Sequence, residues 1–423
     1  MAFRKQISKG IEFLLTHRNP NGGIPAVNLG DASGIWTTAE AIETLLNCPF
    51  LPKEALPQIK EMTEYLINNQ VPGKGWSVSG KGKDISTMAT GHSIVALSLS
   101  KKIFSSDREL NERIEKALNE SCTWLHKNIN LQEGGWGLEP SKASGQEVRI
   151  ISTCYALKGY YAHNQNYHNS NDVKKVVNDL VNRVNKDGGW GRKKGASSDS
   201  CNTARVISIL LQSGNHTKDD LIIINAISFI LHSKDLWRFD IESYVSADSP
   251  GQVYFHSNTY FDVLEALIRY GYFGKEVHEL INFFLDAQDD SSGHWHLFDH
   301  DEKDTSIATW TTTEAIASLS MVQDEYFENI FHQYKNRLPK IWKYLLILFG
   351  SLSLLELLYI FNVYIMIYFW WAQLSEGWQQ TIFSIIVSTF IFGIIAGYFR
   401  DLIAARIKNW SHNLKNRHNR IKR

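Results

Sequence analysis

The segment that decides the fold is Asn185–Gly214, which reads "NKDGGWGRKKGASSDSCNTARVISILLQSG". It passes from a glycine–tryptophan turn through a basic cluster into an apolar stretch with helical periodicity. Related loops occur five more times within residues 1–330, and their centres read "NPNGGIPA", "PGKGWSV", "QEGGWGLE", "KDLWRFD" and "SSGHWHLF". The position of the loop tryptophan recurs every 47 to 60 residues, at Ile24, Trp76, Trp136, Trp190, Trp237 and Trp295.

Each loop lies between two segments with helical patterns. An amphipathic segment such as "VVNDLVNRV" precedes it, and a segment that starts with small residues, such as "NTARVISILL", follows it. A repeat of this length with two helices per unit predicts an α-helical array. The segments Trp36–Leu45 and Trp310–Leu319 are identical at seven of ten positions, so the first and last units resemble each other. We therefore expect an all-α fold over residues 1–334, a six-repeat (α/α)6 toroid in which units one and six meet.

The loop glycines and tryptophans have local roles in this arrangement. The chain must reverse direction between an outer and an inner helix, and glycine supplies the positive φ values that such a turn requires. The tryptophans are expected to fill the gaps between neighbouring units, as packing residues rather than as ligand contacts.

The C-terminal part of the chain has a different composition. Residues 1–334 hold 32 Lys and Arg against 41 Asp and Glu, whereas residues 335–423 hold 12 against 3. Two long apolar runs lie between Tyr344 and Phe399. Their lengths predict two transmembrane helices, a hairpin over residues 335–403 that is followed by a basic tail at 404–423.

Basic residues flank both ends of this hairpin, which places the toroid and both termini in the cytoplasm. The N-terminus has no signal-peptide pattern, so the four cysteines are expected to be reduced. Anionic membrane lipid, rather than nucleic acid, is the expected partner of the tail. Glu356 lies within the first apolar run. It indicates either a homo-oligomer of hairpins, with ion passage, or an unpaired glutamate in a simple anchor.

The glycine–tryptophan repeat resembles the squalene-cyclase/protein-prenyltransferase superfamily of α/α toroids over about residues 5–330. In that superfamily the N-termini of the inner helices meet at one mouth of a central cavity. Its terpene cyclases use an aspartic acid from a D-x-D-D element. Two residues before the threonine of an inner helix this chain has Trp36, Cys201 and Trp310, so the resemblance does not favour a cyclase.

Unit four is similar to the catalytic subunits of protein prenyltransferases, with a glycine–aromatic turn, basic residues and D-x-C before a helix. The resemblance implies Asp199 and Cys201 as catalytic residues and, with His256, as ligands of a zinc ion that activates a thiol. The implied diphosphate-binding residues are Arg149, Arg192 and Lys194. The implied residues that line the cavity beneath an isoprenoid are Tyr155, Tyr254, Tyr260 and Trp310.

Several residues depart from the family pattern. His256 stands three residues before Thr259, about one helical turn early, and Asn202 replaces the aromatic residue that follows the family's cysteine. Asp199 also suits a helix cap and Cys201 a small core residue. A second cluster could bind a metal or be a solvated loop, and it comprises His294, His296, Asp299, His300 and Asp301.

Three functions remain open. In the first, the toroid binds an isoprenoid, lipid or peptide as a membrane-anchored sensor. In the second, the protein is a divergent zinc-dependent prenyltransferase at the inner leaflet. In the third, it is an effector in which ligand binding to the toroid rearranges the hairpin. Binding requires only a cavity, whereas the enzyme requires a metal and converging basic residues. We favour the binding function and keep the enzyme as the alternative.

Overall fold

The computed structural model describes residues 3–26, 32–78, 84–140, 146–163, 170–237, 239–245, 252–298, 303–307 and 309–322. The chain divides into two compact units, Met1–His332 and Gln333–Arg423. The second unit lies outside the described residues, and with it the expected hairpin, Glu356 and the basic tail. In the part of the chain that is described, no helix has the length and apolarity needed to cross a bilayer.

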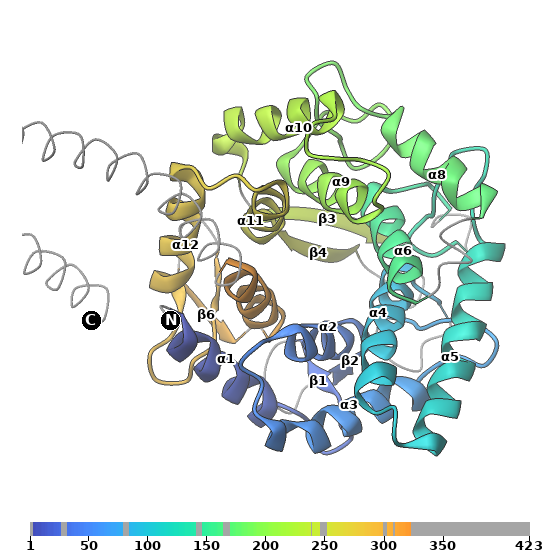
Figure 1. Ribbon diagram of the computed structural model, residues 1–423, viewed down its shortest axis with the longest axis vertical. Helices are drawn as coiled ribbons and strands as arrows, with labels where there is room; N and C mark the ends of the chain where they lie inside the picture. Colours follow the sequence, from blue (N-terminus) through green and yellow to red (C-terminus); the bar gives the residue numbers. More distant parts are fainter. Residues whose placement is uncertain are drawn as a thin grey trace, which may run out of the picture. The chain divides into compact units, whose positions relative to one another are not determined.

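The helices of the first unit form two concentric layers around a central axis (Figure 1). The outer helices are α1 (Arg4–Thr16), α3 (Leu56–Asn68), α5 (Arg108–Lys127), α8 (Asn171–Val181), α10 (Leu221–His232) and α12 (Lys275–Ala287). The inner helices are α2 (Ile35–Asn47), α4 (Thr87–Ile103), α6 (Ile150–His163), α9 (Ser200–Gln212), α11 (Thr259–Tyr270) and a helix at 309–322. Short 3-10 turns, η1 (Lys53–Ala55) and η3 (Lys234–Leu236), precede α3 and follow α10. The expected alternation of outer and inner helices is confirmed for these residues.

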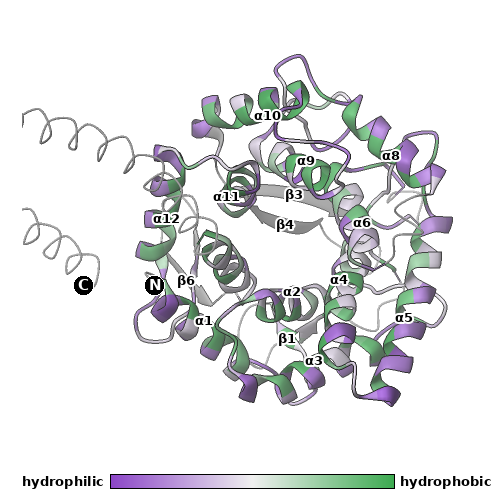
Figure 2. Cartoon of the chain, viewed as in Figure 1, coloured by the Kyte–Doolittle hydropathy of each residue, from purple (hydrophilic) through white to green (hydrophobic). Residues whose placement is uncertain are grey.

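Local sequence explains where many of these helices begin and which face they bury. Ser86, Asp107, Ser170 and Asp199 each accept a hydrogen bond from a backbone N–H in the first turn of α4, α5, α8 and α9, as N-cap residues do. The outer helices turn their apolar residues toward the inner layer and their polar residues outward (Figure 2). This is the pattern of amphipathic helices that cover a core on one side.

In four units the loop tryptophan joins an outer helix to the inner helix that follows it. In unit four the Trp190 indole N–H donates to the Leu180 carbonyl at the end of α8, at 2.8 Å, and the Trp190 backbone N–H donates to Thr203 Oγ1 of α9, at 2.9 Å. The same two bonds occur in units two, three and six, at Trp76, Trp136 and Trp295. Unit one, which has Ile24, forms only the backbone bond, to Thr38. Trp237 forms the indole bond to Ile230. The tryptophans are buried, as expected for packing residues.

The two glycines before Trp190 serve different purposes. Gly188 has a φ of +87°, which residues with a side chain rarely adopt. A Cβ on Gly189 would lie 2.7 Å from Ser198 Cβ. The loop passes so close to the segment that leads into α9 that only glycine fits at this position.

Units one and six meet and close the ring. Thr309 Oγ1 donates to the Pro25 carbonyl, and Gln288 Nε2 donates to the Gln6 carbonyl at 2.9 Å. A Cβ on Gly10 of α1 would lie 2.7 Å from the Trp295 ring, so the two units are in close contact. Figure 1 shows α12 beside α1. We call this junction the seam.

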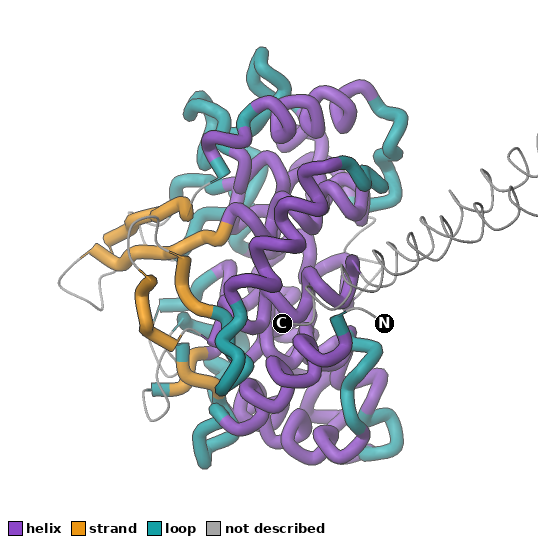
Figure 3. Tube along the Cα trace, turned by 90° about the vertical axis from the view of Figure 1, so that its left-hand side faces the viewer, coloured by secondary structure: helices purple, strands orange, loops and turns teal. Residues whose placement is uncertain are grey.

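The fold also contains strands, which the all-α expectation did not include. Three antiparallel pairs are formed by β1 (Ile24–Pro25) with β2 (Ser33–Gly34), β3 (Phe239–Val245) with β4 (Gln252–Asn258), and β5 (His296–Phe298) with β6 (Lys303–Ile307). All lie on one flank of the helical ring (Figure 3). Each pair belongs to the connection between an outer and an inner helix, where a longer loop folds back on itself. In β3 and β4, Ile241 pairs with His256.

The tryptophan–threonine bond can be tested at Thr203. Thr203→Val replaces the hydroxyl by a methyl group of similar size and leaves the buried Trp190 N–H without its acceptor, which costs about 1–3 kcal/mol. We expect urea unfolding of the full-length chain, followed by circular dichroism, to show this loss. Thr203→Ser keeps the hydroxyl and should retain most of the stability; equal losses in both variants would contradict the assignment.

Candidate functional site

The threonine bonds fix the rotation of the inner helices. Because each threonine points outward to its loop, the residue two positions later, rotated by about 200° on the helix, points to the ring centre. In five inner helices these residues follow Thr38, Thr90, Thr153, Thr203 and Thr312, and in α11 the equivalent position follows Tyr260. They are Glu40, His92, Tyr155, Arg205, Asp262 and Glu314, and all six line one central cavity of about 100 Å³.

A second level of the wall lies one helical turn further along. It comprises Glu43, Lys158, Ser208, Glu265 and Ala317, each three residues after a member of the first level. The cavity is therefore bordered by five carboxylates and two cations. Most small-molecule sites are lined mainly by apolar and aromatic side chains. This one has a charged wall with a surplus of carboxylates.

One turn before the first level, the same register places apolar residues. Met88, Ile151, Cys201 and Trp310 are 3%, 2%, 1% and 6% exposed. The Trp310 ring lies against the Trp36 ring, with centroids 6.1 Å apart. These residues form an apolar layer between the charged wall and the N-terminal ends of the inner helices.

Three of the five carboxylates have a basic partner. Arg205 contacts Asp262 through two bonds, Nη2–Oδ2 at 2.9 Å and Nε–Oδ1 at 3.2 Å. Lys158 Nζ lies 2.7 Å from Glu43 Oε1, and Arg269 Nε lies 2.8 Å from Glu265 Oε1. The Lys158–Glu43 pair joins α6 to α2, the Arg205–Asp262 pair joins α9 to α11, and the Arg269–Glu265 pair lies within α11. The pairs offset the cost of burying the charges.

Glu40 and Glu314 have no such partner among the described residues. They occupy equivalent positions in the two matching segments of units one and six, and each has a buried Oε2 without a hydrogen-bond partner. Burial, and then the neighbouring charge of Glu43, raise the pKa of Glu40 to about 8. Burial, and then the charge of Glu40, raise the pKa of Glu314 well above its ordinary value. The two groups therefore favour their protonated forms at neutral pH.

His92 lies in the same part of the wall. It is 2% exposed, and neither ring nitrogen has a hydrogen-bond partner among the residues that the structure describes. Its ring lies on Tyr155, with centroids 4.1 Å apart, and its Nδ1 is 3.9 Å from Glu43 Oε2. Burial, followed by the charges of Lys158 and Arg205, lowers the pKa of His92 well below its ordinary value. The ring is therefore neutral, with one donor and one acceptor nitrogen. We call Glu40, His92 and Glu314 the acidic corner.

The residues expected to bind zinc have other partners. Asp199 caps α9, and its Oδ1 accepts the Asn202 backbone N–H at 2.7 Å. The Cys201 thiol donates to Asp262 Oδ2 at 3.1 Å, and burial raises the pKa of this thiol well above its ordinary value. His256 lies in β4, and its side chain is outside the described residues.

The zinc site that the resemblance implies would use the Asp199 carboxylate and the Cys201 thiolate as ligands. In this structure the Asp199 carboxylate is engaged by the N-terminus of α9, and the Cys201 thiol is engaged by Asp262. Across the described ranges, no three side chains of the metal-binding types converge on a common position.

The residues expected to bind diphosphate lie outside the cavity wall. Arg149 Nη2 contacts Glu147 Oε2 at 3.0 Å, and Arg192 and Lys194 are exposed. Lys193, which the sequence analysis did not select, contacts the same carboxylate at 2.5 Å.

Of the four expected cavity aromatics, Tyr155 lies in the wall. Tyr260 packs instead on Phe283 of the outer helix α12, with centroids 4.6 Å apart. Trp310 lies in the apolar layer described above. Tyr254 is in β4, and its side chain is outside the described residues.

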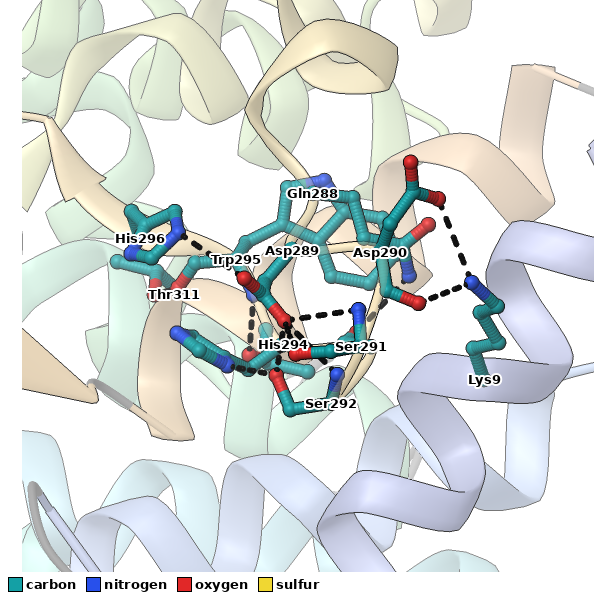
Figure 4. A network of polar contacts seen from close by, with 12 residues as sticks. Lys9, Gln288, Asp289, Asp290, Ser291, Ser292, His294, Trp295, His296 and Thr311 are labelled. Atoms are coloured by element: carbon teal, nitrogen blue, oxygen red, sulfur yellow. Dashed lines mark hydrogen bonds and ion pairs between the residues drawn. The ribbon is translucent and has the colours of Figure 1, made fainter. Parts of the chain in front are cut away.

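The histidine cluster of unit six belongs to the seam (Figure 4). His294 is 5% exposed and contacts Ser292 Oγ through Nδ1 at 2.5 Å, while Asp290 contacts Lys9 of α1. His296 Nε2 lies 3.9 Å from Asp289 Oδ2. This loop packs against the first helix; Asp299, His300 and Asp301 lie outside the described residues.

Comparison with known proteins supports the fold. No protein-family model matches the sequence. A solved structure of the type II terpene cyclase MstE from Scytonema, in complex with merosterolic acid A, is 16% identical, with a TM-score of 0.51 over 76% of this chain and 97% of that chain. The GH76A alpha-1,6-mannanase from Salegentibacter is 12% identical, with a TM-score of 0.53 over 75% and 98%. The chain therefore has the α/α toroid fold that these enzymes share.

The sequence analysis missed Glu40, Arg205, Asp262 and Glu314, although the necessary signal was present. It used the threonines as a register and examined the residue two positions before each one. The charged wall lies two positions after each one.

The acidic corner predicts a dependence of stability on pH. Glu40 and Glu314 have folded-state pKa values above the ordinary 4.5, so the stability from keeping them neutral is complete below pH 4.5 and is lost as the pH rises toward 8. The double variant Glu40→Gln, Glu314→Gln is neutral throughout. Its free energy of unfolding at pH 8 should exceed that of the parent chain by at least about 1.4 kcal/mol, the equivalent of one pKa unit. Urea unfolding at pH 5, 6.5 and 8 measures this; parallel pH profiles would show that the pair does not titrate.

Proposed function

We propose that this chain binds a small polar ligand in its central cavity and acts as a membrane-linked sensor, without turning the ligand over. The observation that supports this most directly is the convergence of one charged or polar side chain from each of the six inner helices on a single cavity. Buried polar atoms in native proteins nearly always have a partner. The unpartnered atoms of Glu40, His92 and Glu314 therefore favour a ligand, or ordered water that a ligand displaces.

The wall narrows the class of ligand. An isoprenoid tail in this cavity would exclude water from the charged wall and offer no hydrogen bond to the unpartnered atoms of Glu40, His92 and Glu314, which is unfavourable. A polar compound, or the polar end of a lipid or peptide, suits the wall better.

A zinc-dependent prenyltransferase remains the alternative, with weaker support. It would require Asp199 to release the Asn202 amide and the Cys201 thiol to lose its proton. Both similar solved structures are enzymes, but at 16% and 12% identity the likeness carries the fold alone.

The link to the membrane rests on sequence. Residues 344–399 contain no Lys, Arg or Asp and are long enough for two crossings. The helix at 309–322 carries Glu314 and is the last inner helix before these residues. A ligand at Glu314 would therefore act on the helix from which the chain continues toward the hairpin.

Ligand binding can be tested by filling the cavity. Ala317→Phe places a ring in the wall, and we expect the full-length protein to lose at least about 90% of any small molecule that co-purifies with it, as measured by native mass spectrometry. Ser106→Phe, at an exposed position, is the control and should retain the ligand. Equal ligand content in both proteins, or none in the parent chain, would argue against a binding function for this cavity.

The membrane link has its own test. Because two hydrophobic crossings hold a protein in the bilayer after peripheral contacts are broken, the full-length chain should stay in the membrane pellet during extraction with alkaline carbonate. Release into the supernatant would contradict the transmembrane hairpin, while leaving the cavity assignment unaffected.

A further inference from the structure

We propose that the ligand of the central cavity is a primary amine, and that its ammonium group binds in the acidic corner between Glu40, His92 and Glu314. The inference rests on the proposed binding function and specifies the chemistry of its ligand.

The hydrogen-bonding capacity of the corner fits an ammonium group. The unpartnered atoms are Oε2 of Glu40, Oε2 of Glu314 and the ring nitrogens of His92, which is 2% exposed. Ionised carboxylates and the unprotonated nitrogen of a neutral imidazole are acceptors. A primary ammonium has three donors and no acceptor, so one group can satisfy an acceptor from each of three different inner helices.

The distribution of charge points to the same group. Asp262, Glu43 and Glu265 are paired with Arg205, Lys158 and Arg269. The two remaining carboxyls, Glu40 and Glu314, stay protonated because they are buried and close to other acids. A cation that enters between them offsets the repulsion that their ionised forms would experience and so favours ionisation. An anionic ligand would raise the cost of ionising these two carboxyls further and would find no unpaired cation in the described wall.

The side of the cavity opposite the acidic corner is suited to the alkyl chain of a small amine and to a second polar group on it. Ile209 of α9 and Phe261 of α11 contribute apolar surface, and Ser208 and Gln212 contribute polar groups. These helices belong to units four and five, whereas the acidic corner belongs to units six, one and two. A short alkyl chain with a second polar group can therefore extend from the corner across the cavity.

The first experiment compares ligands that differ in one property. Ethanolamine and putrescine carry primary ammonium groups; choline carries a quaternary ammonium without N–H donors; ethylene glycol carries no charge. We expect titration calorimetry on the full-length chain at pH 7.5 to show binding of the two amines. Choline and ethylene glycol should bind at least about tenfold more weakly, because the choline ammonium has no N–H to donate and ethylene glycol carries no charge to balance the carboxylates.

The second experiment removes the acceptors. Glu40→Gln and Glu314→Gln keep the shape of the side chains and should each weaken ethanolamine binding at least about tenfold. Glu54→Gln, at an exposed position on η1, is the matched control and should bind like the parent chain. If binding ionises one carboxyl, the affinity should rise about tenfold between pH 6 and pH 7, since one proton is released per amine bound. The double glutamine variant should lack this dependence.

Two sources can present the same ammonium group, a free amine and an ethanolamine lipid headgroup. Nanodiscs that contain phosphatidylethanolamine should compete with ethanolamine if the headgroup is the ligand, whereas phosphatidylcholine nanodiscs should not. Absence of competition identifies a free amine, and both results agree with the inference.

Binding of choline or ethylene glycol as tight as that of ethanolamine would overturn the proposed amine specificity. So would unchanged amine binding in both glutamine variants, or no amine binding at all. If the parent chain binds no amine but retains a non-amine ligand that Ala317→Phe loses, the proposed function stands and only its ligand class is wrong.

Discussion

The bond from the backbone N–H at the loop tryptophan position to a threonine of the next inner helix, seen in five of the six units among the described residues, is the interaction on which this ring depends. It holds an outer helix, a loop and an inner helix together, and it also sets the rotation of the inner helix about its own axis. Once Thr203 points outward to Trp190, Arg205 must point to the centre. A packing contact at the periphery of each unit therefore decides which side chain that unit contributes to the cavity.

This dependence explains what the sequence could predict and what it could not. The glycine–tryptophan loops and the match between Trp36–Leu45 and Trp310–Leu319 were sufficient for a closed helical ring. Of the six inward residues only Tyr155 was expected to line the cavity, because the inward positions hold residues of five different types and form no motif. The positions two residues before the threonines, where an acid was sought, form an apolar layer that includes Cys201 and Trp310. The β3–β4 pair was missed because the alternation in "FDIE" is too short to stand out.

The acidic corner also lies where the ring is least supported by chain connectivity. Units one and six are joined by contacts alone, and a ring selected only for closure would place apolar residues on both sides of that junction. Trp36 and Trp310 meet this expectation, with ring centroids 6.1 Å apart. One turn further along, the same two helices carry Glu40 and Glu314, whose burial opposes closure. Buried acids at a junction where packing alone would favour apolar residues are most readily explained by function.

A ligand that bridges Glu40 and Glu314 would therefore act on the seam as well as in the cavity. It binds only when units one and six are held together, so its binding free energy adds to the stability of the closed ring. The helix at 309–322 forms one side of the seam, and the chain runs from it toward the residues for which the sequence predicts a membrane hairpin. Of the inner helices that the structure describes, this one comes last in the sequence, so the chain continues from it into the C-terminal unit. We infer that occupancy of the acidic corner, through the closure of the seam, is the quantity that such a sensor would report.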